Sequence, residues 1–210
     1  MKKLVLTAAA VACASMVMAQ TTTSQNIVGY TKVSVDGGDL ALVAVNFDSP
    51  ITLQELIGTA VPALSTVYKW DKGTMAYAIA TLNARGAWGP NLTLDIGDAF
   101  YIAPAGAGTS EIIIPGEVLG TDATIPVPTG IVATGMSFPV AQPWTSSALS
   151  GDLPALSTLY TWDQVAQGYG IFTKNARGAW SGNPTIGVKD GFFVDNPGGP
   201  LSVVEPNPVP

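Results

Sequence analysis

Histidine is absent from this sequence of 210 residues, and its single cysteine is Cys13, close to the N-terminus. Without histidine, the usual Ser-His-Asp and Cys-His arrangements of nucleophilic catalysis cannot be built. Zinc sites made of Cys and His are excluded for the same reason. Neither a P-loop nor a dinucleotide-binding Gly-x-Gly-x-x-Gly fingerprint occurs. We therefore expect no metal centre, no cofactor and no catalytic activity.

Charge is scarce and mostly negative. Charged residues make up 11% of the chain, with 9 Lys and Arg against 15 Asp and Glu. An acidic balance argues against nucleic acids and anionic membrane surfaces as partners. After residue 19 no apolar run approaches the roughly 20 residues of a membrane-spanning helix, so we expect no transmembrane segment in the mature chain.

The first residues are typical of a secretory signal peptide. Lys2 and Lys3 precede an apolar or small stretch, 4–18, and a small-x-small cleavage pattern ends at Ala19. We therefore predict a signal peptide over 1–19 and an extracytoplasmic location: secreted, at the cell surface or in the periplasm. A lipoprotein signal ending at Cys13 is an alternative, but the usual Leu is missing and the apolar run continues past the cysteine.

Short strands and tight turns suit the remaining composition, which includes 23 Gly and 16 Pro. Thr and Val favour pleated surfaces, so the sequence predicts an all-β fold. A transmembrane barrel is disfavoured because strands of about 10 residues alternating apolar and polar do not occur.

The chain contains one stretch twice. Residues 62–102 and 154–194 align without gaps, and 21 of the 41 positions are identical. A weaker match extends the repeat to about 88 residues, which indicates an internal duplication. We predict a signal peptide followed by two tandem β units, 20–115 and 116–210. Each is a small β-sandwich or barrel-like unit with at most one short helix, and the two pack together because each is marginal alone.

Local patterns predict the elements of the first unit. Residues 27–35 alternate as a strand, and 40–47 form a nearly continuous apolar strand. Thr52 and Glu55 make a capping-box pattern, which predicts a short helix ending near Gly58.

An aromatic face is shared by the two copies. Tyr68 and Trp70 alternate along a predicted strand and recur as Tyr160 and Trp162, whereas the intervening Lys69 is replaced. The simplest reason for keeping one face is burial, so we expect these rings to fill a core poor in Leu and Phe.

Two identical Asn-Ala-Arg-Gly turns, 83–86 and 175–178, predict hairpins with a bulge. A tryptophan follows each turn, and its flat amphipathic ring can stack on a sugar. The neighbouring arginine can lie over that ring as a cation. The candidate ligand-binding residues are therefore Trp88, Trp180, Arg85 and Arg177, with core packing as the competing interpretation.

Carboxylates offer a weaker alternative. A glycosidase needs two acids about 5–9 Å apart in one cleft, and turn carboxylates that hydrogen-bond the backbone explain the same residues equally well. The acids kept in both copies are Asp71, Asp98, Asp163 and Asp190.

Taken together, Asn46-Phe47, the Trp-Asp strand ending at Asp71 and the Gly-Asp-Ala-Phe-Tyr-Ile segment of 97–102 resemble a β-rich module. That module occurs in secreted and surface proteins of environmental Gram-negative bacteria, related to those with a Gly-Trp-Asn-Leu-Ile-Ser motif. The resemblance implies an extracytoplasmic β domain and transfers no catalytic residue.

The sequence thus predicts a secreted or cell-surface structural or adhesive β-repeat protein. Its expected partners are further copies of itself, paired through exposed strand edges, or a cell-surface polysaccharide. The alternative is a carbohydrate-binding module that uses the tryptophans beside the turns, and the weaker one is a carboxylate-dependent hydrolase.

Overall fold

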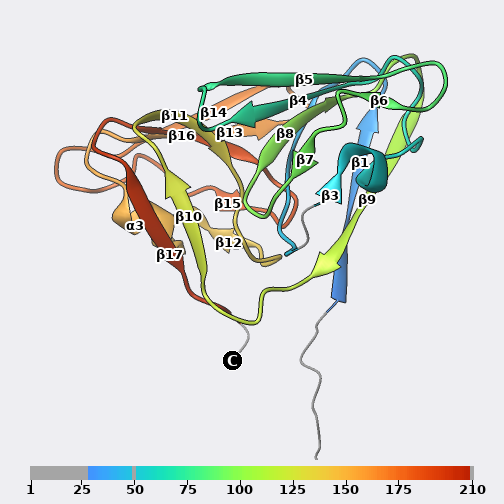
Figure 1. Ribbon diagram of the computed structural model, residues 1–210. Helices are drawn as coiled ribbons and strands as arrows, with labels where there is room; N and C mark the ends of the chain where they lie inside the picture. The colour runs from blue at the N-terminus through green and yellow to red at the C-terminus, as the bar shows by residue number, and fades with distance from the viewer. Residues whose placement is uncertain (1–27, 49–50, 209–210) are drawn as a thin grey trace, which may run out of the picture.

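The computed structural model describes residues 28–48 and 51–208 (Figure 1). The predicted signal peptide and Cys13 lie outside these residues. The described chain is mostly β, as predicted, with two short α-helices, α2 (Leu53–Leu56) and α3 (Ala148–Asp152), and a 3-10 turn, η1 (Trp144–Ser146). The β-strands form several antiparallel sheets.

Residues 28–117 contain a five-stranded sheet of order β2-β8-β4-β5-β6 and the two-stranded sheets β1-β9 and β3-β7. The strands are β1 (Val28–Asp36), β2 (Ala41–Ala44), β3 (Ile51–Thr52), β4 (Thr66–Asp71), β5 (Ala76–Leu82), β6 (Trp88–Gly89), β7 (Thr93–Leu94), β8 (Ala99–Ala103) and β9 (Thr109–Glu117).

Residues 123–205 contain a four-stranded sheet of order β11-β16-β13-β14 and the pairs β10-β17 and β12-β15. The strands are β10 (Ala123–Val127), β11 (Gly130–Thr134), β12 (Gln142–Pro143), β13 (Thr158–Asp163), β14 (Gly168–Thr173), β15 (Thr185–Ile186), β16 (Phe192–Asn196) and β17 (Leu201–Glu205). In the described chain, every pair of named strands falls within one of these two ranges.

Helix α2 begins with the predicted capping box. The Thr52 hydroxyl accepts the backbone N–H of Glu55, and the Glu55 carboxylate accepts the backbone N–H of Thr52 at 3.0 Å. A helix this short depends on packing, and Leu53 and Leu56 are buried in the core of the first range. In the second range the 3-10 turn η1 takes the place of α2, and Ser147 caps the helix α3 that follows it.

The shared aromatic face has a different role from the one predicted. Val67 and Leu159, on the opposite faces of β4 and β13, are fully buried in two separate cores. Tyr68 and Tyr160 are half-buried and pack around a third apolar cluster. Its buried members come from both ranges, and they are Leu42, Ala99, Tyr101, Ala133 and Phe193. The aromatic rings therefore fill the junction between the two large sheets.

Contacts across this junction are reciprocal. Trp70 meets Phe193 at 5.7 Å between ring centroids, and the equivalent pair, Trp162 and Tyr101, meets at 5.3 Å. Each is an edge-to-face contact of the favoured kind. Reciprocity of this kind is the property of an isologous interface, in which each side offers the same patch.

Backbone hydrogen bonds repeat the pattern. The Ala44 N–H donates to the Lys189 carbonyl at 3.0 Å, and the equivalent Gly135 N–H donates to the Gly97 carbonyl at 3.2 Å. These bonds cover the outer edge of β2 and the end of β11, so the two sheets are joined along that side.

Candidate functional site

The two tryptophans beside the hairpin turns lie at unequal depths. Trp88 is 5% exposed, and its indole N–H donates to the Gly58 carbonyl at 3.0 Å. Trp180 is half-buried, donates to the Ser150 carbonyl at 3.2 Å and packs edge-to-face on Trp144. Trp88 therefore has no open ring face on which a sugar can stack. We exclude it from the candidate ligand-binding residues.

Arg85 and Arg177 are exposed in their turns, where the backbone N–H of each donates to an asparagine side chain. Among the described residues, the cation that lies over a tryptophan is Lys174, 5.8 Å above the ring of Trp180. The described chain therefore forms neither expected arginine–tryptophan pair: a buried lysine lies over Trp180, and Leu82 occupies the equivalent position near Trp88.

Two of the four aspartates cap turns. The Asp71 carboxylate accepts the backbone N–H groups of Thr74 at 3.0 Å and Gly73 at 2.8 Å, which lowers its pKa. Asp163 binds the two equivalent N–H groups in the second range. Backbone hydrogen bonds of this kind explain why both acids follow a strand.

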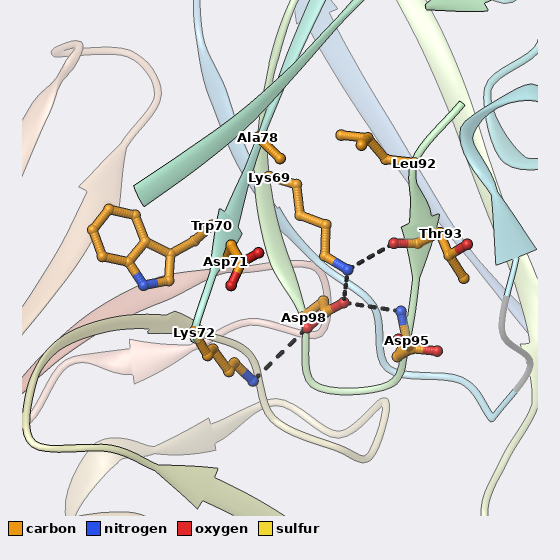
Figure 2. Close-up of a pocket in the computed structure, with 9 residues that line it drawn as sticks. All are labelled: Lys69, Trp70, Asp71, Lys72, Ala78, Leu92, Thr93, Asp95 and Asp98. Carbon is orange, nitrogen blue, oxygen red and sulfur yellow. Dashed lines mark hydrogen bonds and ion pairs between the residues drawn. The ribbon is translucent and has the colours of Figure 1, made fainter. Parts of the chain in front are cut away.

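The other two shared aspartates, Asp98 and Asp190, differ in their partners. Asp98 forms ion pairs with Lys69 at 2.7 Å and Lys72 at 3.8 Å, and it accepts the backbone N–H of Asp95 at 3.0 Å (Figure 2). Burial lowers the pKa of Lys72. Asp190 accepts the backbone N–H of Gly187.

These acids line two different cavities. The charged pocket, of about 400 Å³, is lined by Lys69, Trp70, Asp71, Lys72, Ala78, Leu92, Thr93, Asp95 and Asp98. A second cavity of about 390 Å³ contains Asp163 and Asp190, with Thr161 and Gln164 at the positions of the two lysines. Each cavity therefore holds two of the four aspartates, but Asp71 and Asp163 each accept two backbone N–H groups and Asp98 pairs with two lysines. The arrangement does not favour paired-carboxylate chemistry.

A third cavity lies at the junction of the two large sheets. This aromatic groove has a volume of about 360 Å³ and is lined by Leu40, Tyr68, Tyr77, Tyr101, Trp162 and Tyr169. Tyr77 on β5 is 41% exposed and Tyr169 on β14 is 46% exposed. The groove is therefore built from side chains about 90 residues apart in the sequence, and its lining contains no charged side chain.

The tyrosine hydroxyls of the groove differ in their bonding. The hydroxyls of Tyr101 and Tyr169 share a hydrogen bond of 2.5 Å. In the described chain the Tyr77 hydroxyl has no such partner, because Phe193 stands at the position equivalent to Tyr101. Burial raises the pKa of Tyr77 to about 12 and raises the pKa of Tyr101 as well. Both phenols therefore stay neutral at physiological pH.

The two equivalent tryptophans of the junction, Trp70 and Trp162, differ in their hydrogen bonds. The Trp162 N–H donates to the Leu40 carbonyl at 3.0 Å, and the Gln167 side chain binds the N–H and the carbonyl of Leu40 at 2.9 and 3.1 Å. Around Trp70, Met75 occupies the position equivalent to Gln167 in the repeat. The buried Trp70 N–H has no partner in the described residues.

The two large sheets share one uncovered side, which we call the open rim. It consists of Ala76–Ala80 of β5 and Gly168–Phe172 of β14, which both lie at the top of Figure 1. No described strand pairs with the outer edge of either segment. Ile79 and Ile171 are 52% and 61% exposed there.

The sequence also marks these positions. Tyr77 and Ile79 recur in the second copy at period two as Tyr169 and Ile171, which marks a strand. Their exposure and their meeting across the groove depend on how the two sheets pack.

None of the described helices has the length and apolar character needed to cross a membrane. Comparison of the chain with family models, with characterised proteins and with solved structures finds no match.

Proposed function

We propose that this is a non-catalytic, extracytoplasmic structural or adhesive protein that joins surfaces by self-association through the open rim. The observation that carries the proposal is the pair of uncovered strand edges on one side of the molecule. An uncovered edge presents unpaired backbone N–H and C=O groups, which another strand can bind.

The open rim lacks the features that usually protect a strand edge. Natural edges carry charged residues, proline or a bulge, whereas Ala76–Ala80 and Gly168–Phe172 contain neither a charged residue nor a proline. Ile79 and Ile171 add apolar area that a partner would remove from water. A second copy of the chain offers the same two edges and the same side chains.

We also infer that the two described ranges descend from one duplicated unit. In support, β2-β8-β4-β5 and β11-β16-β13-β14 have the same order, and each strand begins 89 to 93 residues after its counterpart. The reciprocal contacts at the junction fit the same origin. The domain boundaries at 20–115 and 116–210 remain a prediction.

The absence of catalysis and the extracytoplasmic location are parts of the proposal. The four aspartates kept in both copies are occupied by backbone N–H groups or lysines. The location rests on the signal-peptide pattern of 1–19 and on the lack of cysteine in the rest of the chain.

Sedimentation velocity of the mature protein over a range of concentrations tests self-association. We expect oligomers in the unaltered protein and a monomer in the double variant Ile79→Lys/Ile171→Lys, because a charge on each edge opposes strand pairing. Tyr30→Lys is the matched control, since Tyr30 is 72% exposed on β1 and away from the rim. A monomer at every concentration, or oligomers that survive the double substitution, would contradict the proposal.

A further inference from the structure

We propose that the aromatic groove binds a hexose ring of a neutral polysaccharide. This site differs from the predicted one at Trp88 and Trp180, and binding there does not require self-association. The cavity volume of about 360 Å³ falls in the usual range of small-molecule sites.

The shape and chemistry of the lining favour a flat ligand with an apolar face and polar edges. Tyr77 and Tyr169 stand on different sheets with nearly half of each side chain exposed. Trp162 and Tyr101 lie deeper and contact each other edge-to-face at 5.3 Å, which holds both rings in place. A pyranose has C–H groups on its faces and hydroxyls around its rim, so it matches aromatic walls that carry phenolic hydroxyls.

Charge decides between classes of polysaccharide. No charged side chain lines the groove, and the phenols of Tyr77 and Tyr101 stay neutral. The sequence as a whole carries a net charge of −6. A uronate polymer would meet no cation in the groove and a negative field around it. The site therefore suits neutral hexoses rather than acidic ones.

Two hydroxyls of the lining, those of Tyr68 and Tyr77, have no partner in the described part of the chain and are free to bind the ligand. The hydroxyls of Tyr101 and Tyr169 bind each other, and the Trp162 N–H is used by Leu40. The Tyr77 hydroxyl, which has no partner among the described residues, is left to exchange a hydrogen bond with a sugar hydroxyl. Tyr77 is thus expected to contribute both ring contact and orientation.

The groove is lined in part by the two strands of the open rim, since Tyr77 lies on β5 and Tyr169 on β14. A second copy seated on the rim would cover it. If both proposals hold, a neutral polysaccharide will shift the unaltered protein toward monomer.

Calorimetric titration of the mature protein tests the site. The probes are soluble neutral glucans, mannans and galactans, with alginate as the acidic comparison. We expect at least one neutral polymer to bind, alginate not to bind, and Tyr77→Ala to weaken binding by about tenfold or more, as truncation of an aromatic anchor does.

The repeat supplies a matched control. Tyr68 lines the groove, whereas the equivalent Tyr160 does not, although both are half-buried on the same face of equivalent strands. Tyr68→Ala is expected to weaken binding and Tyr160→Ala to leave it nearly unchanged. No binding of any neutral polymer at millimolar sugar, equal binding of alginate, or equal losses in the two variants would overturn the proposal.

The two proposals fail separately. The double variant Ile79→Lys/Ile171→Lys changes the rim but none of the side chains that line the groove. Sugar binding that persists in this variant supports the groove whatever its oligomeric state. Sugar binding that disappears there is explained by the new lysine opposite Tyr68, so the Tyr68→Ala and Tyr160→Ala pair decides the groove and sedimentation decides self-association.

Discussion

The junction offers a direct test of its unequal hydrogen bonding, because Trp70 and Trp162 are equivalent residues in different situations. The Trp162 N–H donates to the Leu40 carbonyl at 3.0 Å, whereas the Trp70 N–H is buried without a partner in the described chain. We predict that Trp162→Phe lowers the free energy of unfolding more than Trp70→Phe does.

The magnitude follows from the two hydrogen-bonding states. Both substitutions remove the same ring atoms, so their packing costs cancel to a first approximation. Trp162→Phe also removes a hydrogen bond, which contributes about 1 kcal/mol. Trp70→Phe removes an unsatisfied donor, whose burial costs about 1–3 kcal/mol, and the lower end applies because the side chain is only half-buried. The two variants should therefore differ by about 2 kcal/mol.

Equilibrium urea unfolding followed by far-ultraviolet circular dichroism measures this difference without relying on the altered fluorophores. Each variant is compared with the unaltered protein at the same concentration, since self-association would add to apparent stability. Equal losses would refute the reasoning and would mean that water satisfies the Trp70 N–H. A larger loss in Trp70→Phe would mean that packing, not hydrogen bonding, governs the junction.

Three further substitutions have expected outcomes. Burial raises the pKa of the Glu205 carboxyl group above its value in the unfolded chain. Its stabilising contribution is therefore present below about pH 4.3 and is lost as the pH rises through the folded pKa. Glu205→Gln should raise the melting temperature near neutral pH and change it little in acid. Lys174 donates to three backbone carbonyls at the end of α3, so Lys174→Met should cost about 2–4 kcal/mol in urea unfolding, against less than about 0.5 kcal/mol for exposed Arg177→Met. A Cβ at Gly135 would lie 2.2 Å from that of Ala44, so Gly135→Ala should cost about 1–3 kcal/mol and Ala44→Gly in the same chain should recover much of it.

Each of these has a contradicting result. A pH-independent effect of Glu205→Gln would mean that its carboxyl group titrates normally. Similar losses for the lysine and arginine variants would show that the carbonyl contacts add little. If the losses of unfolding free energy from Gly135→Ala and Ala44→Gly simply add, the two side chains do not clash as expected.

Local sequence patterns predicted the elements whose causes are local. The capping box of Thr52 and Glu55 acts within one turn of chain, and α2 begins there. The period-two pattern at Tyr68 and Trp70 correctly indicated a strand and a shared face. Periodicity identifies a face but not what covers it, so the pattern did not distinguish a core from a junction between sheets.

The candidate site depended on contacts that are distant in sequence. Trp88 and Trp180 follow identical turns, yet their burial is set by the carbonyls of Gly58 and Ser150, 30 residues earlier. The aromatic groove exists only because the two large sheets pack against each other, and no pattern within either copy of the repeat predicts that packing. The sequence therefore shows which aromatic residues repeat, but not which of them the packing of the two sheets brings together.

The close approach at the junction limits how alike the two halves can be. Ala44 faces Gly135, and Ala99 lies 3.0 Å from where a Cβ of Gly191 would be. In each case one methyl group fits where two would collide, and the residues that meet are equivalent. A homodimer of identical units would have needed glycine on both sides, leaving a gap. Because the two ranges differ in sequence, one side carries the methyl group and the other leaves room for it, so the junction packs more closely than an exactly symmetric one could.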